Sequence, residues 1–247
     1  MARATLRWLD HRCTLDAESE LLDATLRLLP GFHPERHAPD APAPSPDVEA
    51  GEGEDAESLE YAVVRALLSQ DRRHIHLHAA AAELSPGHAL LVLGPSGAGK
   101  STMARTFMSA GHRIFGDDVV ALGPEGLVPF PRMVKLEGEA APIDVEAAQP
   151  ERAATLLDPG PGGWWAPGPA EVAGIIVVEW QDGAAASLDV LDQAVTLRHL
   201  LDAVHSTTHD ADARLDALAM LATRTPAARI VHGDAGTALA SIATWLG

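Results

Sequence analysis

The sequence predicts an α/β fold built on a mixed β-sheet with flanking helices, and two features near its centre support this prediction. Residues 94–101 (GPSGAGKS) fit the phosphate-binding loop (P-loop) pattern G-x-x-x-x-G-K-[ST]. An apolar run at 89–93 predicts a buried strand before the loop, and residues 102–108 begin a helix after it. A turn at 83–87 joins that strand to another expected at 74–82. Since so short a connection cannot cross over a sheet, the two strands should pair antiparallel.

The loop has the chemistry of a nucleotide-phosphate site. Its glycines let consecutive backbone N–H groups turn towards phosphate oxygens, and the helix N-terminus adds partial positive charge. Lys100 is expected to reach the β- and γ-phosphates of ATP, and the Ser101 hydroxyl to ligate Mg²⁺. An ordinary glycine-rich turn with a surface lysine is the alternative, and the strand–loop–helix context argues against it. The predicted nucleotide-binding residues are Gly94, Pro95, Ser96, Gly97, Ala98, Gly99, Lys100, Ser101 and Thr102.

Composition narrows the class of protein. The 247 residues suit one domain with a small appendage, or two modest domains. Acidic residues outnumber basic ones by 35 to 18, which disfavours nucleic acid and anionic membranes as partners. The single cysteine, Cys13, excludes an internal disulfide framework and a cysteine-rich metal site. No apolar run approaches the ~20 residues that span a bilayer. We therefore expect a cytoplasmic protein, and homo-oligomerisation stays open.

The chain divides by composition into an appendage at 1–57 and a P-loop domain at 58–247. The appendage should hold a strand at 4–8 and a helix capped by Asp16, followed at 34–57 by a linker rich in proline and acidic residues. A helix should begin at Ser58. The remaining expected elements are a strand at 113–116, a hairpin at 119–130, a loop at 138–170, paired strands at 173–180 and 187–191, helices at 195–204 and 211–222, a strand at 228–232 and a helix at 235–246.

A second group of candidate residues follows the strand at 113–116. Asp117 and Asp118 stand where that strand ends, at the sheet edge where ligands bind beside a P-loop. A carboxylate there can ligate Mg²⁺ or accept the proton of an attacking hydroxyl. Adjacent side chains on an extended strand point to opposite sides, so the two aspartates should have different roles. A turn with two solvated acids is the alternative.

Three segments together resemble the catalytic domain of the HPr kinase/phosphorylase family, and more closely its smaller HPr-kinase-related members. They are His78-Ala79, the P-loop and residues 111–118 (GHRIFGDD), and the similarity covers residues 74–122. The resemblance implies the fold of ATP-dependent phosphoenolpyruvate carboxykinase, with a P-loop in a mixed sheet. It also implies transfer of the γ-phosphoryl group of ATP to a serine or threonine hydroxyl. The family's E-x-R-G segment is not found here, so the reverse phosphorylase reaction is not implied.

The resemblance assigns roles to individual positions. Asp118 would be the base for the hydroxyl, Asp117 its neighbour at the metal beside Ser101, and His78 would lie near the same carboxylate. Arg132 belongs to a proline–arginine segment and is a candidate for stabilising phosphate charge, or else part of a basic patch on a hairpin. Apart from the resemblance, the position of Trp164-Trp165 on a glycine-rich loop favours either a lid or substrate platform, or aromatic residues that anchor the loop to the core.

Three hypotheses for function follow. The leading one is a kinase for a protein or peptide, such as the precursor of a ribosomally made natural product. The second is a kinase for a small molecule such as an amino acid or a sugar. The third is a nucleotide-gated binding protein that hydrolyses ATP slowly and switches conformation.

Overall fold

The computed structural model describes residues 1–29, 31–38, 44–132, 164–205 and 210–247, which form two compact units. The first unit comprises Met1–Arg72 with Pro131–Met133, and the second comprises Arg73–Phe130 with Val134–Gly247. The division therefore falls after residue 72, not after residue 57 as the composition indicated. The physical reason is that helix α2 (Ala56–Gln70) packs on the helix and strands of the first unit.

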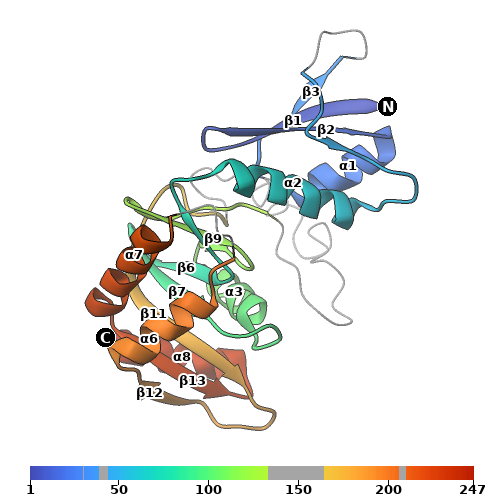
Figure 1. Cartoon of the computed structure of the whole chain (residues 1–247). Helices are drawn as coiled ribbons and strands as arrows, with labels where there is room; N and C mark the ends of the chain where they lie inside the picture. The colour runs from blue at the N-terminus through green and yellow to red at the C-terminus, as the bar shows by residue number, and fades with distance from the viewer. Residues whose placement is uncertain (30, 39–43, 133–163, 206–209) are drawn as a thin grey trace. The chain divides into compact units, whose positions relative to one another are not determined.

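The first unit is a mixed four-stranded sheet with helices α1 (Ser19–Leu28) and α2 packed against it (Figure 1). Its strand order is β3-β1-β2-β4, with bounds β1 (Ala2–Trp8), β2 (His11–Ala17), β3 (Glu35–His37) and β4 (Val48–Glu49). Two predictions for this region were wrong. Asp16 lies inside β2 and does not cap a helix, and the expected linker contributes β3 and β4 to the sheet.

Side-chain periodicity explains the helices of this unit. Apolar residues at helical spacing are buried at Leu22 and Leu26 of α1, and at Leu59, Val63 and Leu67 of α2. Helix α2 begins two residues before the expected start. The Asp55 side chain caps it by accepting a hydrogen bond from the Ser58 N–H at 2.8 Å.

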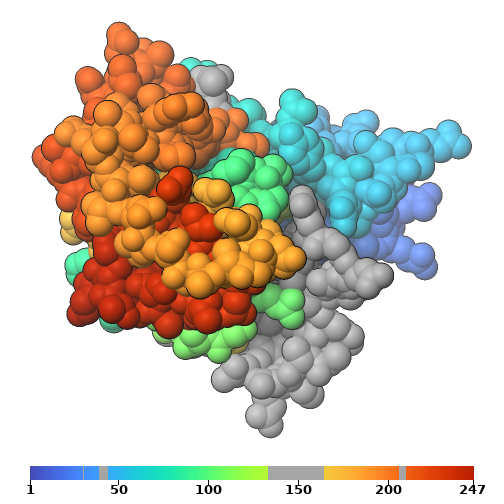
Figure 2. Space-filling view, turned by 90° about the horizontal axis from the view of Figure 1, so that it is seen from below, coloured from blue at the N-terminus to red at the C-terminus, as the bar shows by residue number. Residues whose placement is uncertain are grey.

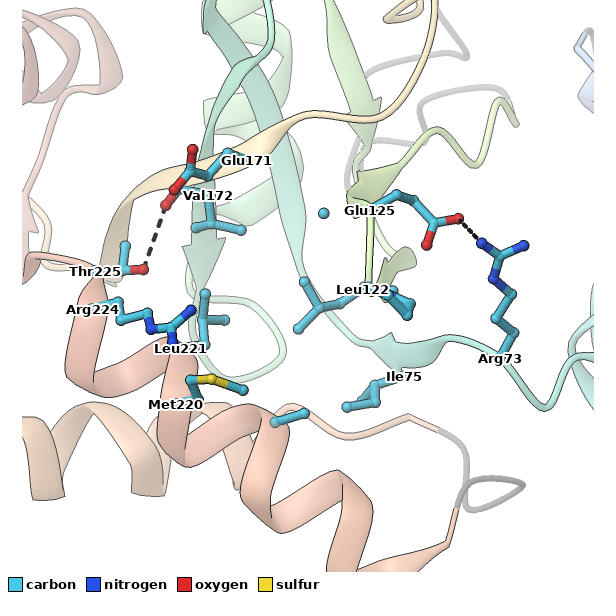
Figure 3. Close-up of a pocket in the computed structure, with 14 residues that line it drawn as sticks. Arg73, Ile75, Leu122, Glu125, Glu171, Val172, Met220, Leu221, Arg224 and Thr225 are labelled. Carbon is cyan, nitrogen blue, oxygen red and sulfur yellow. Dashed lines mark hydrogen bonds and ion pairs between the residues drawn. The ribbon is translucent and has the colours of Figure 1, made fainter.

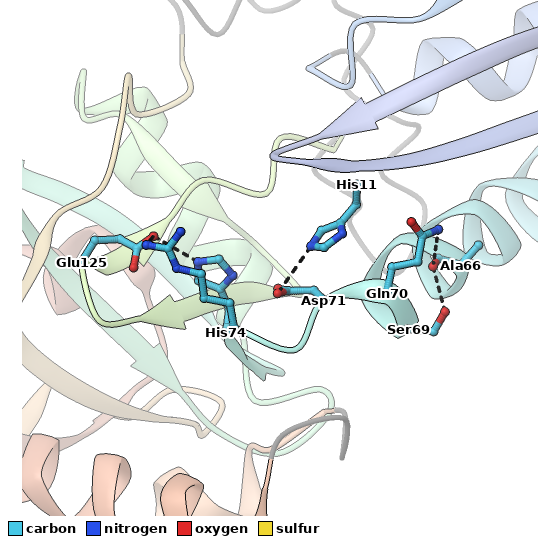
Figure 4. Close-up of polar contacts among 8 residues, drawn as sticks. His11, Ala66, Ser69, Gln70, Asp71, His74 and Glu125 are labelled. Atoms are coloured by element: carbon cyan, nitrogen blue, oxygen red, sulfur yellow. Dashed lines mark hydrogen bonds and ion pairs between the residues drawn. The ribbon is translucent and has the colours of Figure 1, made fainter.

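The end of α2 is tied to the β1–β2 hairpin by polar contacts (Figure 4). The Gln70 side-chain amide donates to the Arg12 carbonyl at 2.8 Å, and the His11 ring lies 3.5 Å from the fully buried Asp71 carboxylate. These contacts explain why α2 belongs to the first unit.

The second unit is built on a six-stranded mixed sheet in the order β12-β13-β11-β7-β6-β8. Its bounds are β6 (Ala80–Ser85), β7 (His88–Leu93), β8 (Ile114–Gly116), β11 (Glu171–Trp180), β12 (Ser187–Val190) and β13 (Ala227–His232). The predicted antiparallel pairing of β6 with β7 is confirmed, as is the predicted α/β class with a mixed sheet. Strand β12 pairs with β13 and not with β11 as expected, because β7 and β13 occupy both sides of β11.

The strand expected at 74–82 is divided between two sheets. Its first part, β5 (Ile75–Leu77), joins a three-stranded sheet with the predicted hairpin of β9 (Val120–Gly123) and β10 (Gly126–Val128). Its second part is β6 of the six-stranded sheet. The chain changes sheets at His78 and Ala79.

Helices cover both faces of the six-stranded sheet (Figure 1). Helices α3 (Lys100–Ser109) and α8 (Ala235–Leu246) pack on one face through Phe107 and Ile242, and α8 is the red segment exposed in Figure 2. Helices α6 (Gln193–Asp202) and α7 (Ala211–Arg224) pack on the other face through Leu200 and Leu218. None of the helices in the described ranges combines the length and apolar character needed to cross a bilayer.

Candidate nucleotide site at the phosphate-binding loop

The P-loop connects the end of β7 to the start of α3, as predicted. Its backbone needs glycine: Gly99, with φ of 98°, forms the left-handed N-cap of α3. Gly94 has φ of 154°, and a Cβ added there would lie 2.9 Å from the Val178 carbonyl oxygen of β11. The loop is therefore held close against the neighbouring parallel strand.

A cavity of about 390 Å³ opens over this loop. Three other segments contribute to its wall: the β5–β6 junction, the residues after β8, and the end of β11. The lining residues are Ser96, Gly97, Gly99, Lys100, Ser101, Thr102, His78, Asp118 and Trp180. The structure thus brings His78 and Asp118 to the P-loop. Gly94, Pro95 and Ala98 complete the turn without lining the cavity.

The Lys100 ammonium group is placed at the loop itself. Its Nζ donates hydrogen bonds to the carbonyl oxygens of Gly94 at 3.0 Å and Pro95 at 3.1 Å. Lys100 is 6 % exposed, so its stem is packed while its charged end faces the loop. This position puts a cation beside the backbone N–H groups that would surround a phosphate.

His78 and Asp118 form a pair on the wall of the same cavity. His78 Nε2 lies 3.2 Å from Asp118 Oδ1, and the two side chains are 39 % and 41 % exposed. Burial, followed by the charge of Lys100, lowers the pKa of His78 from its usual 6.5, while Asp118 opposes this shift. The imidazole is therefore neutral at neutral pH, and the geometry allows its Nε2–H to donate to the carboxylate.

Asp117 and Asp118 have different surroundings, as their predicted opposite orientations require. Asp117 is 2 % exposed and does not line the cavity, while its backbone carbonyl lies 3.5 Å from the Ser101 hydroxyl. The structure therefore does not bring the Asp117 carboxylate, predicted as a metal ligand, to the cavity surface. Within the described residues, no group of three or more histidine, cysteine, aspartate or glutamate side chains could hold a metal. Mg²⁺ carried by a nucleotide needs only one or two protein ligands besides phosphates and water.

Arg132 is not brought to this cavity. It belongs to the first unit, where its Nε lies 3.0 Å from the Glu60 carboxylate, and both side chains are almost fully buried. A structural ion pair therefore replaces the predicted contact with phosphate. Position was misleading here, because Arg132 follows the hairpin of the second unit by only a few residues.

The tryptophan pair at 164–165 anchors its segment to the core. Trp165 is 3 % exposed and packs in the cluster that includes α3, and the Ile114 N–H donates to the Trp164 carbonyl at 2.7 Å. The anchor alternative therefore holds for Trp165. Most of the predicted loop at 138–170 lies outside the described residues, as does the region of the missing E-x-R-G segment.

Trp180 is a cavity residue that the sequence analysis missed. It is the last residue of β11, 46 % exposed, and contributes an indole to a wall otherwise made of polar and glycine residues. The available signal was its place at the carboxyl end of a core strand beside the P-loop strand, where ligands bind in such sheets.

A second, larger cavity of about 610 Å³ lies at the opposite ends of the strands (Figure 3). Its walls come from the start of β11, the β9–β10 hairpin and helix α7, which supplies Met220, Leu221 and Arg224. Arg73 on its rim is paired with Glu125 at 3.3 Å, and Glu125 also lies 3.2 Å from His74. None of the site residues predicted from the sequence is among the described residues that line this second cavity.

Comparison with known proteins does not assign the chain to a family. No protein-family model matches the sequence, and no curated protein is significantly similar to it. Functional inference therefore depends on the geometry of the P-loop cavity.

Proposed function

We propose that this protein is an ATP- and Mg²⁺-dependent phosphotransferase of the HPr kinase type, acting on a serine or threonine hydroxyl of a protein or peptide. The observation that carries the proposal is that the His78–Asp118 pair lines the same cavity as the P-loop. A cavity that only holds nucleotide needs the loop and its lysine. A carboxylate facing them adds a proton acceptor at the position where transfer would occur.

The reaction can be written with the residues present. The substrate hydroxyl oxygen attacks the γ-phosphorus of ATP, the bond from that phosphorus to the β–γ bridging oxygen breaks, and ADP leaves. Asp118 accepts the hydroxyl proton, and neutral His78 orients the carboxylate by donating a hydrogen bond to it. Lys100 and the loop N–H groups balance the negative charge on the phosphates.

Bound Mg²⁺ would supply charge neutralisation at the β- and γ-phosphates. Among the residues present, the Ser101 hydroxyl suits it, since it is the P-loop position that ligates Mg²⁺ and it lines the cavity. One such ligand fits a cation that arrives with the nucleotide and keeps phosphate and water ligands.

A large acceptor suits this site better than a small metabolite. The Asp118 side chain is 41 % exposed, so its carboxylate is accessible to a hydroxyl on an extended chain. A kinase for a small molecule is the alternative within enzymes, and a nucleotide-gated switch is the alternative outside them.

The test is phosphoryl transfer from labelled ATP·Mg²⁺ to candidate peptides and small hydroxyl compounds, with ATP binding measured separately. Asp118→Asn should reduce transfer by about 10²- to 10⁴-fold while leaving ATP affinity nearly unchanged. Lys100→Ala should lose both. Intact ATP binding by the wild type without transfer to any hydroxyl would refute the proposal and favour a switch.

A further inference from the structure

Trp180 has an unusual environment for a large aromatic residue. It ends a strand whose preceding residues, Ile176 and Val178, pack in the core on the α3 side of the sheet. Continuing this alternation, Trp180 belongs to the same face as α3, the helix that begins at the P-loop. Instead of being buried it is 46 % exposed and lines the P-loop cavity. A large apolar surface at a polar cavity indicates a contact with a ligand.

The ring of His232 packs against the indole of Trp180. The two residues are directly paired in the parallel register of β11 and β13, and their rings meet edge to face, with centroids 5.4 Å apart and an interplanar angle of 88°. The Gln181 N–H donates to the His232 carbonyl at 3.0 Å, which continues the pairing past Trp180.

The His232 ring is uncharged at neutral pH and packs against Trp180. The residue is fully buried. Burial is the main cause that lowers the pKa of His232 below its usual 6.5, and a backbone hydrogen bond with Asp234 and the Asp234 carboxylate oppose this shift. A neutral aromatic ring suits edge-to-face packing against the indole.

The distance from the loop to this tryptophan is short along the sheet. Gly94, where the loop begins, closely approaches the Val178 carbonyl of β11, two residues before Trp180. A nucleotide with its phosphates on residues 96–101 therefore has Trp180 on the wall of the same cavity. Every base presents a π-face, so stacking on an indole needs no particular pattern of hydrogen bonds.

We infer that Trp180 is the platform on which the base of the bound nucleotide stacks, and that His232 is a positioning residue that holds the indole in place. This inference rests on the proposed function, since it requires a nucleotide in the P-loop cavity. It adds a specificity contact that separates nucleoside triphosphates from other polyphosphates.

The experiment compares two ligands that differ only in the presence of a nucleoside. Binding of ATP and of inorganic tripolyphosphate, each with Mg²⁺, is measured by titration calorimetry. Trp180→Ala should weaken ATP binding by about tenfold to a hundredfold and leave tripolyphosphate within twofold. Trp180→Phe should retain most of the ATP affinity. Tyr61→Ala, which removes an exposed aromatic ring from the first unit, is the matched control and should change neither affinity.

The positioning role has its own pair of variants. His232→Ala should weaken ATP binding severalfold, and His232→Phe should restore it, because only the ring edge is required. Equal losses in the two variants would overturn the positioning role. Thermal unfolding of each variant verifies that it is folded.

The outcomes separate this inference from the proposed function. Failure of the wild type to bind either ligand would refute nucleotide binding and with it the proposed function. Binding of both ligands with no effect of Trp180→Ala, or with an equal effect on ATP and tripolyphosphate, would overturn the platform alone.

Discussion

The buried ion pair between Glu60 and Arg132 makes a sharp prediction about the first unit. Glu60 on α2 is 1 % exposed at its side chain and Arg132 is 8 % exposed, with 3.0 Å between the charged atoms. Glu60→Gln would remove the Glu60 carboxylate that lies against the buried guanidinium charge. Breaking a buried pair in this way costs about 3–5 kcal/mol. We expect a loss in that range, which is a large share of the ~5–15 kcal/mol that stabilises a typical domain.

Urea unfolding followed by far-UV circular dichroism measures this loss, and a double variant tests its cause. Because two buried charges also carry a desolvation penalty, Glu60→Leu combined with Arg132→Met should recover most of the stability lost in either single variant. A cost below about 1 kcal/mol for Glu60→Gln, or no recovery in the double variant, would refute the reasoning.

The same double variant separates the structural role of Arg132 from the catalytic role that its sequence position predicted. If Arg132 only stabilises the first unit, the folded double variant should transfer phosphate at close to the wild-type rate. A drop in kcat of more than about tenfold would instead indicate stabilisation of charge in the transition state.

Three further predictions concern the second unit. Gly94→Ala should weaken ATP binding at least about tenfold and lower the Tm, since the new Cβ would lie 2.9 Å from the Val178 carbonyl oxygen. Calorimetry and thermal unfolding measure these effects, and Gly168→Ala is the control because Gly168 has open space around it. In the pH profile of kcat/KM, the acidic limb should have its midpoint below pH 6.5, because protonation of His78, whose pKa is lowered, weakens the neighbouring carboxylate as a base. His78→Asn should remove that limb, and an unchanged profile in this variant would contradict the prediction. The contribution of His232 to the free energy of unfolding should be complete above pH 6.5 and decrease as pH falls towards its lowered folded pKa, with a slope of at most about 1.4 kcal/mol per pH unit. His232→Phe should reduce the pH dependence of the urea unfolding midpoint between about pH 5 and 7.5.

The parts of the fold that the sequence predicted are those set by local pattern. The P-loop pattern, the apolar strand before it and the helix after it all follow from residues within a few positions of one another. The antiparallel pairing of β6 and β7 follows from the short turn between them. The C-terminal helix, Ala235–Leu246, has the expected bounds because the Asp234 side chain caps it by accepting from the Thr237 N–H.

The parts that the sequence did not predict depend on contacts between distant residues. No glycine or proline separates β5 from β6, so nothing local shows that the two halves enter different sheets. Strand β12 was assigned to the wrong neighbour because strand order is decided by β7 and β13 together. The proline-rich segment forms β3 and β4 because contacts with distant residues hold it to β1 and β2. The Thr5 hydroxyl lies 2.8 Å from His37 Nε2, and the Thr14 N–H donates to the Asp47 carboxylate at 2.7 Å.

The residues of the candidate site likewise differ in whether a local pattern or a contact between distant residues places them there. The loop residues were found from a motif whose chemistry is local, and Asp118 from its place where a strand ends beside that loop. His78 was found only through the resemblance. Trp180 belongs to no motif and enters the site because β11 lies beside the P-loop strand. Arg132 was included because it follows the hairpin in sequence, whereas its partner Glu60 is on a helix of the first unit.

The division of one strand between two sheets is what creates the His78–Asp118 pair. At the junction, the His78 N–H donates to the Ala203 carbonyl at 2.6 Å, and the Ala79 N–H donates to the Asp118 carbonyl at 3.2 Å. Had β5 continued into β6 within one sheet, these N–H groups would face a neighbouring strand, and no bond would tie residue 79 to residue 118. Backbone hydrogen bonds of the fold therefore hold the segments that carry the imidazole and the carboxylate next to each other. It follows that the pair should be formed before any nucleotide binds, which is the preorganisation that proton acceptance by Asp118 requires.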